Sequence, residues 1–295
     1  MNKKIFYILF ALLFFSCQSL GVNKNNSKVW NKGAMVSAAN PYAVKAAISI
    51  LEKGGSATDA AIAAHLVLGL VEPQSSGLGG GGFILNYNFK TNNLTFIDGR
   101  ETAPASAKID MFMKDDGNVM SFMEAVPSGK AVGTPGIVAL YETAHKAYGL
   151  LPWPMLFENA INLSKNGFIV SPRLANYVEL AEKKGRLSKN PLTKKYFYPN
   201  GLKIKSGDLL KNPEYTNTLK AIAKEGAIAF YNGNIAKEIV SAVNADPHPG
   251  EMTLVDLKNY NAVLRPVICG PFRNMKICTT SPPSSGGAQI MIAGL

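Results

Sequence analysis

The glycine-rich stretch Glu72–Asn88, EPQSSGLGGGGFILNYN, is the first place in the sequence where chemistry could be expected. Gly77, Gly79 and Gly82 have the spacing G-x-G-x-x-G, which in nucleotide-binding proteins cradles phosphate. That site requires a strand before the glycines and a helix after them, because the helix N-terminus offers its amides to the anion. Here a helix-like run precedes the glycines and a strand-like run follows them. The order of the elements therefore excludes a phosphate loop, and the closely flanking core-type segments exclude a plain linker.

Arg100 is the second candidate, in the segment I-D-G-R-E-T-A-P. It ends the second strand of an expected hairpin, where Gly99 gives the backbone freedom and Pro104 turns the chain away. An arginine at such a strand end can bind a carboxylate through two parallel hydrogen bonds. The alternative is a surface arginine paired with Asp98 or Glu101, and from the residues alone this alternative is favoured.

Hydrolytic and metal sites have little support in the sequence. No G-x-S-x-G motif occurs, and no pattern nominates a Ser–His–Asp triad. His65 lies in an apolar helix-like run and is predicted to be a satisfied core residue. His145, beside Lys146, is predicted to be solvated, and His248 lies in a turn. The three histidines do not have metal-ligand spacing, so we expect no metal site.

The elements that position these residues can be predicted from caps and periodicity. Asn40 and Pro41 begin a helix that Gly54 ends, and Ser56 with Asp59 forms a capping box ahead of a buried helix, AAIAAHLVLGLV. No repeat and no internal linker is found. The other predicted elements are a hairpin turning at Thr91–Asn93, helices near Ile137–Tyr148, Met155–Asn166, Tyr215–Lys224 and Ile235–Val243, a basic loop-rich segment at Lys183–Lys205, a strand pair near Arg265–Thr279 and an apolar helix start in GGAQIMIAGL.

The bulk composition is that of a globular protein. The chain has 295 residues, of which 47% are hydrophobic and 17% charged. Its net charge of +11 comes from 31 basic and 20 acidic residues that are interpreted as scattered along the chain. Nucleic-acid binding therefore has little support.

Residues 1–16 are predicted to be an export signal of the lipoprotein type. Their apolar run, Ile5–Phe15, is too short to span a membrane. The small residue before Cys17 fits lipidation of that cysteine, with cleavage elsewhere as the alternative. Residues 17–31 are then a polar tether, and we expect an exported protein, periplasmic or anchored to a bacterial membrane by its lipid alone.

The other two cysteines of the chain, Cys269 and Cys278, lie at the outer ends of two short apolar runs. A hairpin would bring them together as a disulfide, whereas two separate buried thiols are an equally good interpretation.

Five segments in order resemble the γ-glutamyltranspeptidase family. Any one of them would be weak, but together they indicate that residues 32–295 resemble part of the family's large subunit, truncated at its C-terminal end. The segments are GGSATDAAIAAHLVLGLVEPQSSGLGGGGFILNYN, IDGRETAPASA, GTPGIVALYETAHKAYGLLPW, MTLVDLKNYNAVLRPVICGPF and SPPSSGG.

The resemblance implies an N-terminal-nucleophile hydrolase with an α+β fold, a four-layer αββα sandwich that is incomplete in this chain. Such a protein is made as a precursor that cleaves itself into a large and a small subunit. It uses no cofactor, and it transfers the γ-glutamyl group of glutathione or related compounds to water or to an acceptor amino acid or peptide. The arginine of the family's D-x-R-E-x-A-P motif grips the α-carboxylate of that group and corresponds to Arg100, which favours the binding role over surface pairing.

One departure from the family pattern is as important as the match. The T-T-H-x-S segment that carries the threonine nucleophile is absent, since Thr279-Thr280-Ser281 lacks the histidine and precedes SPPSSGG. The nucleophile is therefore expected beyond Leu295, and the chain alone is predicted to be inactive. The alternatives are a related glutaryl or cephalosporin acylase and a non-catalytic truncated lipoprotein.

Overall fold

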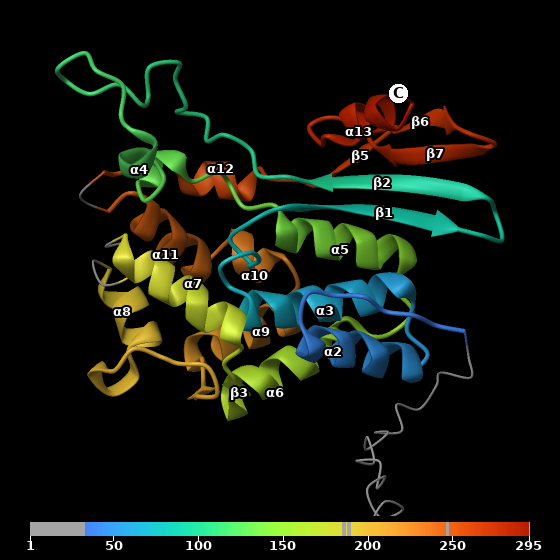
Figure 1. Ribbon diagram of the computed structural model, residues 1–295, viewed down its shortest axis with the longest axis horizontal. Helices are drawn as coiled ribbons and strands as arrows, with labels where there is room; N and C mark the ends of the chain where they lie inside the picture. Colours follow the sequence, from blue (N-terminus) through green and yellow to red (C-terminus); the bar gives the residue numbers. More distant parts are fainter. Residues whose placement is uncertain (1–32, 185–186, 188–189, 246–247, 295) are drawn as a thin grey trace, which may run out of the picture. The chain divides into compact units, whose positions relative to one another are not determined.

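Two consecutive helices, α2 (Pro41–Glu52) and α3 (Ala57–Val71), open the described part of the computed structural model (Figure 1). The side chain of Asn40 accepts a hydrogen bond from the backbone amide of Tyr42 at 3.0 Å, and Ser56 with Asp59 forms the capping box of α3, as predicted. Residues 36–295 form one compact unit. The predicted signal segment, Cys17 and the tether lie outside the described residues, which are 33–184, 187, 190–245 and 248–294.

A three-stranded antiparallel sheet contains the predicted hairpin. Strand β1 (Gly82–Asn88) pairs with β2 (Asn93–Gly99) so that Gly82 lies opposite Gly99. The third strand, β5 (Val263–Arg265), comes from far along the chain and pairs with the other edge of β2. The sheet order β1-β2-β5 thus brings the end of the hairpin next to a segment that no local pattern connects with it.

Helix α5 (Ile137–Tyr148) covers one face of this hairpin and lies between it and α3 (Figure 1). Its residue Leu140 packs so closely on the end of β2 that a Cβ atom at Gly99 would lie 2.5 Å from the Leu140 side chain. Both Leu140 and Ile97 of β2 are almost fully buried. The end of β2 is therefore held against a rigid helix.

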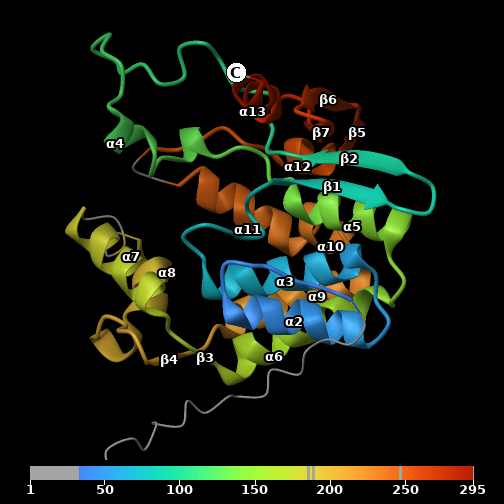
Figure 2. The same cartoon turned by 45° about the vertical axis from the view of Figure 1, so that its right-hand side comes forward.

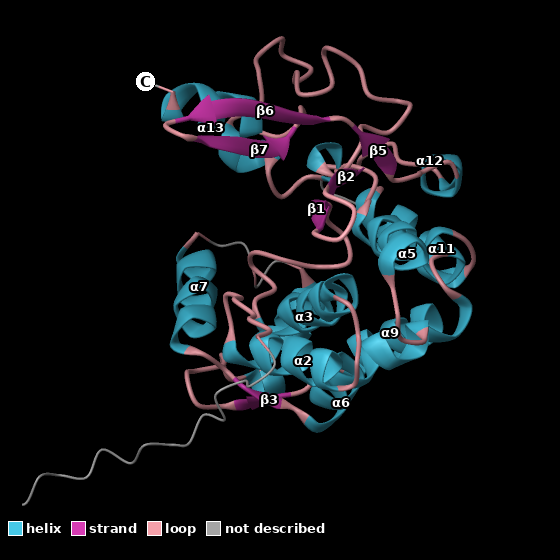
Figure 3. Ribbon diagram, turned by 90° about the vertical axis from the view of Figure 1, so that its right-hand side faces the viewer, coloured by secondary structure: helices cyan, strands magenta, loops and turns pink. Residues whose placement is uncertain are grey.

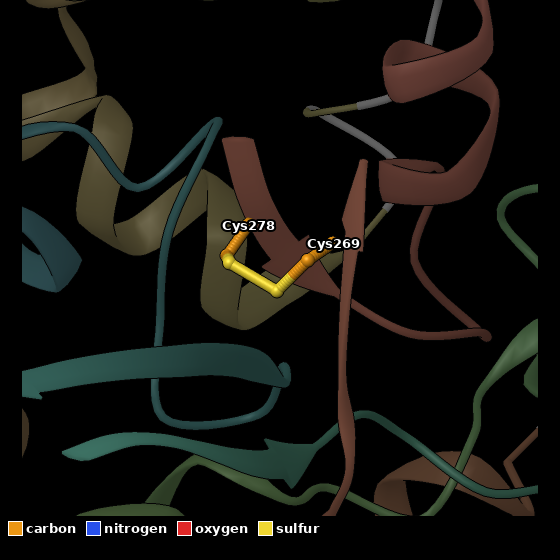
Figure 4. The surroundings of a disulfide bond; sticks show 2 residues. All are labelled: Cys269 and Cys278. Atoms are coloured by element: carbon orange, nitrogen blue, oxygen red, sulfur yellow. A yellow bond between two sulfur atoms is a disulfide. The ribbon is translucent and has the colours of Figure 1, made fainter. Parts of the chain in front are cut away.

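A second hairpin, β6 (Val267–Phe272) with β7 (Met275–Thr280), lies on the side of β1–β2 away from α5 (Figures 1 and 3). Cys269 and Cys278 are directly opposite each other in it, with their Cα atoms 4.1 Å apart, and form a disulfide (Figure 4). The pairing that the sequence left open is thus formed. Helix α13 (Gly286–Ala293), the predicted apolar helix start, packs on this hairpin.

The remaining helices were predicted in part. Helices α9 (Pro213–Glu225) and α11 (Asn234–Val243) match the prediction, whereas the helix predicted from Met155 is a 3-10 turn, η2 (Trp153–Phe157), followed by α6 (Glu158–Asn166). The other short elements are α4 (Phe122–Ala125), η1 (Gly129–Ala131), β3 (Phe168–Ile169), η3 (Pro199–Gly201), β4 (Leu209–Leu210), α10 (Ile228–Tyr231) and α12 (Leu254–Lys258). Figure 2 labels α4, β3, β4, α10 and α12.

The segment expected to be loop-rich is partly helical. Helix α7 (Pro172–Lys183) precedes it and was not predicted, and α8 (Pro191–Phe197) lies within it. Both begin with proline at the first helical position after a capping side chain, Ser171 for α7 and Asn190 for α8. These caps outweigh the polar composition that suggested a loop.

The observed fold is α+β. In the described residues the largest sheet has three strands and the other two sheets have two each. No helix in that same part of the chain is long and apolar enough to cross a membrane.

Candidate functional site

Arg100 immediately follows β2 and projects an exposed side chain, 59% accessible. Its Nε atom lies 3.3 Å from Oε2 of Glu101, so the local ion pair foreseen as an alternative is formed with Glu101. It is not formed with Asp98, because Oδ2 of Asp98 accepts a hydrogen bond from Nε of Arg265 at 2.6 Å. Pairing through Nε leaves the two terminal nitrogens of Arg100 able to bind an external carboxylate.

The backbone of Arg100 is fixed on both sides. Its amide donates to Oδ1 of Asp98 at 2.8 Å, and its carbonyl accepts from the hydroxyl of Tyr260 at 2.7 Å. Asp98 is 5% exposed and joins β2 to Arg265 on β5. The exposed guanidinium therefore extends from a backbone that is held by Asp98 of β2 and by Tyr260.

Tyr260 itself is held by stacking on Tyr231, with ring centroids 5.8 Å apart and planes 7° from parallel. Burial raises the pKa of the Tyr260 phenol to about 12, and the nearby carboxylates Asp98 and Glu101 add to this. The phenol thus stays protonated at neutral pH and remains a donor to the Arg100 carbonyl.

The glycine-rich loop packs against the same segment. The carbonyl of Gly80 accepts hydrogen bonds from the amides of Gly136 at 2.9 Å and Ile137 at 3.0 Å, at the start of α5. A Cβ atom at Gly81 would lie 2.5 Å from the carbonyl oxygen of Gly99 and 2.7 Å from Oε2 of Glu101. The chain can therefore pass behind Arg100 only without a side chain at position 81.

Two other glycines of the run have no such constraint. A Cβ atom at Gly77 or Gly79 would meet nothing within 4 Å. Close packing of the backbone thus explains why position 81, next to the candidate site, requires glycine. It does not explain the glycines at positions 77 and 79.

Glu101 and Thr102 continue the candidate site away from Arg100. Oε2 of Glu101 is buried and has no hydrogen-bond partner among the described residues. The same atom forms the ion pair with Nε of Arg100. Thr102 exchanges backbone hydrogen bonds with Thr134, at 2.8 Å and 3.3 Å. The segment that bears Arg100 is therefore bound between the glycine loop and residues 133–136.

Sequence reasoning missed Tyr260, Asp98 as an acceptor, Arg265 and Gly136. Tyr260 and Arg265 come from the segment NYNAVLR, whose proximity to Arg100 depends on the pairing of β5 with β2. Asp98 was considered only as an ion-pair partner of Arg100. The tightly packed Gly136 lies in the segment GTPGIVALYETAHKAYGLLPW, where its glycine could have indicated a close backbone approach.

His65 is a satisfied residue, as predicted. Its Nδ1 atom contacts the hydroxyl of Tyr141, and its Nε2 atom lies 2.9 Å from the hydroxyl of Ser76. Tyr141 lies on α5, and Ser76 begins the glycine loop. Burial raises the pKa of the Tyr141 phenol, so this hydroxyl remains protonated. His65 therefore connects α3, α5 and the loop through neutral groups.

His145 corrects a prediction. It is not solvated: its side chain is 18% exposed, packs on Trp153 and lies 2.8 Å from the carbonyl oxygen of Leu151 through Nε2. The same atom is 3.7 Å from Oδ1 of the buried Asp59. The sequence placed His145 next to a lysine, but the helix turns the two side chains in different directions.

Replacing His65 by Gln is expected to flatten the pH dependence of stability. Burial lowers the pKa of His65 below its ordinary value of 6.5. The unfolded chain then binds a proton more readily, so the free energy of unfolding falls as the pH drops through the unfolded pKa toward the lower folded one. Urea unfolding from pH ~7 to ~5 should show a shallower loss for His65→Gln than for the wild type. The exposed His248→Gln variant is the control for loss of a histidine elsewhere in the chain. A slope for His65→Gln equal to that of the wild type would contradict the assignment.

The described residues contain no group of three or more His, Cys, Asp or Glu side chains placed to hold a metal ion. The arrangement around Arg100 can instead bind a carboxylate, because it offers an exposed planar cation on a fixed backbone.

Comparison with known proteins gives the family. Residues 43–295 match the profile described as Gamma-glutamyltranspeptidase. The glutathione hydrolase proenzyme of Bacillus subtilis strain 168 is 40% identical over 261 residues, which are 88% of this chain and 43% of that protein. The glutathione hydrolase proenzyme of Escherichia coli K12 is 38% identical, over 88% of this chain and 44% of that protein. The chain thus spans less than half the length of these relatives.

Solved structures agree. The structure of Helicobacter pylori gamma-glutamyltranspeptidase matches with a TM-score of 0.82 and 34% identity, over 88% of this chain and 72% of that chain. A cephalosporin acylase from Bacillus halodurans matches with a TM-score of 0.70 and 28% identity, over 80% of this chain and 44% of that chain. Because the profile match extends over most of the sequence, the chain belongs to the γ-glutamyltranspeptidase family.

Proposed function

We propose that this chain forms the donor-binding part of a γ-glutamyltranspeptidase that hydrolyses glutathione and related γ-glutamyl amides. The observation that carries the proposal is the exposed guanidinium of Arg100 on a backbone fixed by Asp98 and Tyr260. Its two terminal nitrogens would grip the α-carboxylate of the γ-glutamyl group. The names of the relatives, glutathione hydrolase proenzymes, support glutathione as the donor and a precursor form.

In the proposed reaction, a threonine from the remainder of the whole protein attacks the γ-carbonyl carbon of the donor. Its α-amine accepts the hydroxyl proton and passes it to the departing amine, so that an acyl-enzyme ester replaces the amide bond. Water or the amine of an acceptor amino acid or peptide then takes the acyl group. Arg100 contributes by position: it fixes the end of the donor that does not react, which places the γ-carbonyl for attack.

Glu101 has a defined part in this scheme. By holding Nε of Arg100 at 3.3 Å, it orients the guanidinium plane before the donor arrives. An oriented fork loses less conformational freedom on binding than a free side chain would.

The finer features of the family are part of the same proposal. The described sheets would be completed by a small subunit, made from the same precursor by self-cleavage, into a four-layer αββα sandwich. The hairpin β6–β7 above β1–β2, with α5 on the opposite face, supports this arrangement (Figure 1). Export, lipidation of Cys17 and a periplasmic or membrane-anchored location are proposed from the sequence alone.

A related acylase is the second candidate, and the likeness to the cephalosporin acylase of Bacillus halodurans favours it. Arg100 would bind the carboxylate of a glutaryl side chain equally well, so this residue does not discriminate between the two. A non-catalytic lipoprotein is the third interpretation. It requires residues 1–295 to fold alone and bind glutamate.

The whole protein, with the nucleophile-bearing part present, is expected to release p-nitroaniline from γ-glutamyl-p-nitroanilide much faster than from glutaryl-p-nitroanilide. The reason is that only the first substrate carries the α-amino acid group of the natural donor. Residues 1–295 alone should show no turnover of either. Faster turnover of the glutaryl amide would favour the acylase, and glutamate binding by residues 1–295 in calorimetry would favour the non-catalytic protein.

A further inference from the structure

The net charge of the chain is concentrated in one segment. Residues 183–211 contain nine lysines and arginines but one acidic residue, Asp208, a net charge of +8 out of +11 for the whole chain. The other 266 residues contain 22 basic and 19 acidic residues and are nearly balanced. The interpretation that basic residues are scattered is therefore wrong, and this segment needs its own explanation.

The segment belongs to a part of the fold that we call the basic lobe, residues 172–214, which contains α7, α8 and β4. Figures 1 and 2 show α7 and α8 on the same side of the molecule. Ion pairs neutralise some of its lysines: Lys183 and Lys203 pair with Glu179, and Lys195 lies 3.1 Å from Glu214. Within the described part of the lobe, four exposed lysines have no recorded ion pair: Lys184, Lys194, Lys205 and Lys211.

Large apolar side chains are exposed among these lysines. Leu192 and Leu202 are each 75% exposed, and Leu209 is 59% exposed. Leu192 and Leu209 line one hollow of about 710 Å³ together with Lys195 and Lys211. Glu214, the ion-pair partner of Lys195, lines the same hollow, and Lys211 is its lysine without a recorded ion pair. The hollow therefore brings exposed leucines, which are unfavourable in water, next to a free lysine.

We propose that this face of the basic lobe binds an anionic lipid surface. The lysines would meet the phosphate headgroups, and Leu192 and Leu209 would enter the boundary between headgroups and acyl chains, as in proteins that lie on a membrane. The proposal goes beyond the reaction proposed above and does not depend on acylation of Cys17.

A nucleic acid fits this face less well. The described residues of the lobe include one arginine, Arg173, and it is engaged: its guanidinium lies 3.3 Å from Glu72 and over the ring of Tyr177. In the described part of the lobe the cations without a recorded ion pair are lysines, which bind phosphate as point charges without the bidentate geometry of arginine. Exposed leucines, moreover, add nothing to binding a phosphate backbone but contribute directly to binding a bilayer.

The test is sedimentation of the full chain with vesicles, in a Cys17→Ser background that cannot be acylated. We expect binding to phosphatidylcholine vesicles that contain phosphatidylglycerol and none to vesicles of phosphatidylcholine alone. Lys194→Glu with Lys211→Glu should weaken binding by about tenfold or more. Each lysine near an anionic surface contributes to the binding free energy, and a glutamate in its place is repelled by that surface. Leu192→Ser with Leu209→Ser should weaken it by about tenfold at physiological salt, where the electrostatic part is screened.

The matched control reverses two exposed lysines outside the lobe, Lys220→Glu with Lys237→Glu, and so makes the same change in net charge. It should bind nearly as well as the parent. Equal losses in the control and in the lobe variant would overturn the proposal, because net charge alone would then explain binding. The proposal is also overturned if the parent protein stays in the supernatant with anionic vesicles. If that protein instead shifts duplex DNA in a gel, the face binds a nucleic acid. Far-ultraviolet circular dichroism of each variant verifies that the fold is intact.

Discussion

Arg100→Lys is expected to reduce kcat/KM of the whole enzyme for γ-glutamyl donors by roughly 100-fold, equivalent to about 2 to 3 kcal/mol of lost binding in the transition state. Lysine keeps the positive charge but cannot offer two parallel N–H groups to one carboxylate. Lysine also has no further nitrogen through which Glu101 could orient it. In the wild type, Oε2 of Glu101 lies 3.3 Å from Nε of Arg100 and leaves the two terminal nitrogens to the donor. Arg100→Ala, which removes the charge as well, should cost more.

The measurement is steady-state turnover of γ-glutamyl-p-nitroanilide beside 4-aminobutyryl-p-nitroanilide, which lacks the α-carboxylate. The wild-type enzyme should strongly prefer the first donor, and Arg100→Lys should lose most of that preference, because the two donors differ at the group that Arg100 is proposed to bind. Arg273→Lys, at the turn of the β6–β7 hairpin, is the control for an Arg-to-Lys change elsewhere. If Arg100→Lys has the wild-type KM and rate, the assigned role is wrong.

Local patterns sufficed for the elements that immediately precede Arg100. The caps at Asn40 and Ser56 lie within three residues of the amides they bind, so the beginnings of α2 and α3 were readable from the sequence. The β1–β2 hairpin was readable for the same reason, since its turn and both strands are contiguous. Polar composition misled where it competed with caps, as at Asn190, where a helix begins inside a lysine-rich segment.

Long-range contacts could not be predicted in the same way. The bond from Tyr260 to the carbonyl of Arg100 joins residues 160 apart, and the bond from Arg265 to Asp98 joins residues 167 apart. Nothing near Tyr260 specifies which strand β5 will join. The family resemblance identified Arg100 as the residue to examine, but only the fold shows what immobilises it.

Environment, too, depends on tertiary packing. His145 was predicted to be solvated because a lysine follows it, yet Gly149 and Leu151 turn the chain back over its ring. Consecutive residues of a helix, such as His145 and Lys146, point in different directions, so an exposed lysine does not indicate that the histidine before it is exposed.

Gly136→Ala is expected to damage both stability and donor binding, although it adds a single methyl group. A Cβ atom at this position would lie 2.2 Å from the carbonyl oxygen of Gly99 and 2.1 Å from the hydroxyl of Tyr260. The first contact is with backbone that Leu140 also confines, so it cannot be relieved by rotating a side chain. The second would push Tyr260 away from the Arg100 carbonyl.

The expected cost in the free energy of unfolding is about 1 to 3 kcal/mol, the usual range for overpacking a close-packed site. Gly79→Ala is the control, because a Cβ atom there meets nothing within 4 Å and the backbone does not have a positive φ. Urea unfolding of the two variants measures the stability. Turnover at a temperature where both are folded measures the second effect: Gly136→Ala should show a raised KM for γ-glutamyl-p-nitroanilide, since Arg100 depends on the displaced Tyr260. A Gly136→Ala protein as stable and as active as Gly79→Ala would mean that the contacts among Gly99, Gly136 and Tyr260 do not hold Arg100 in place.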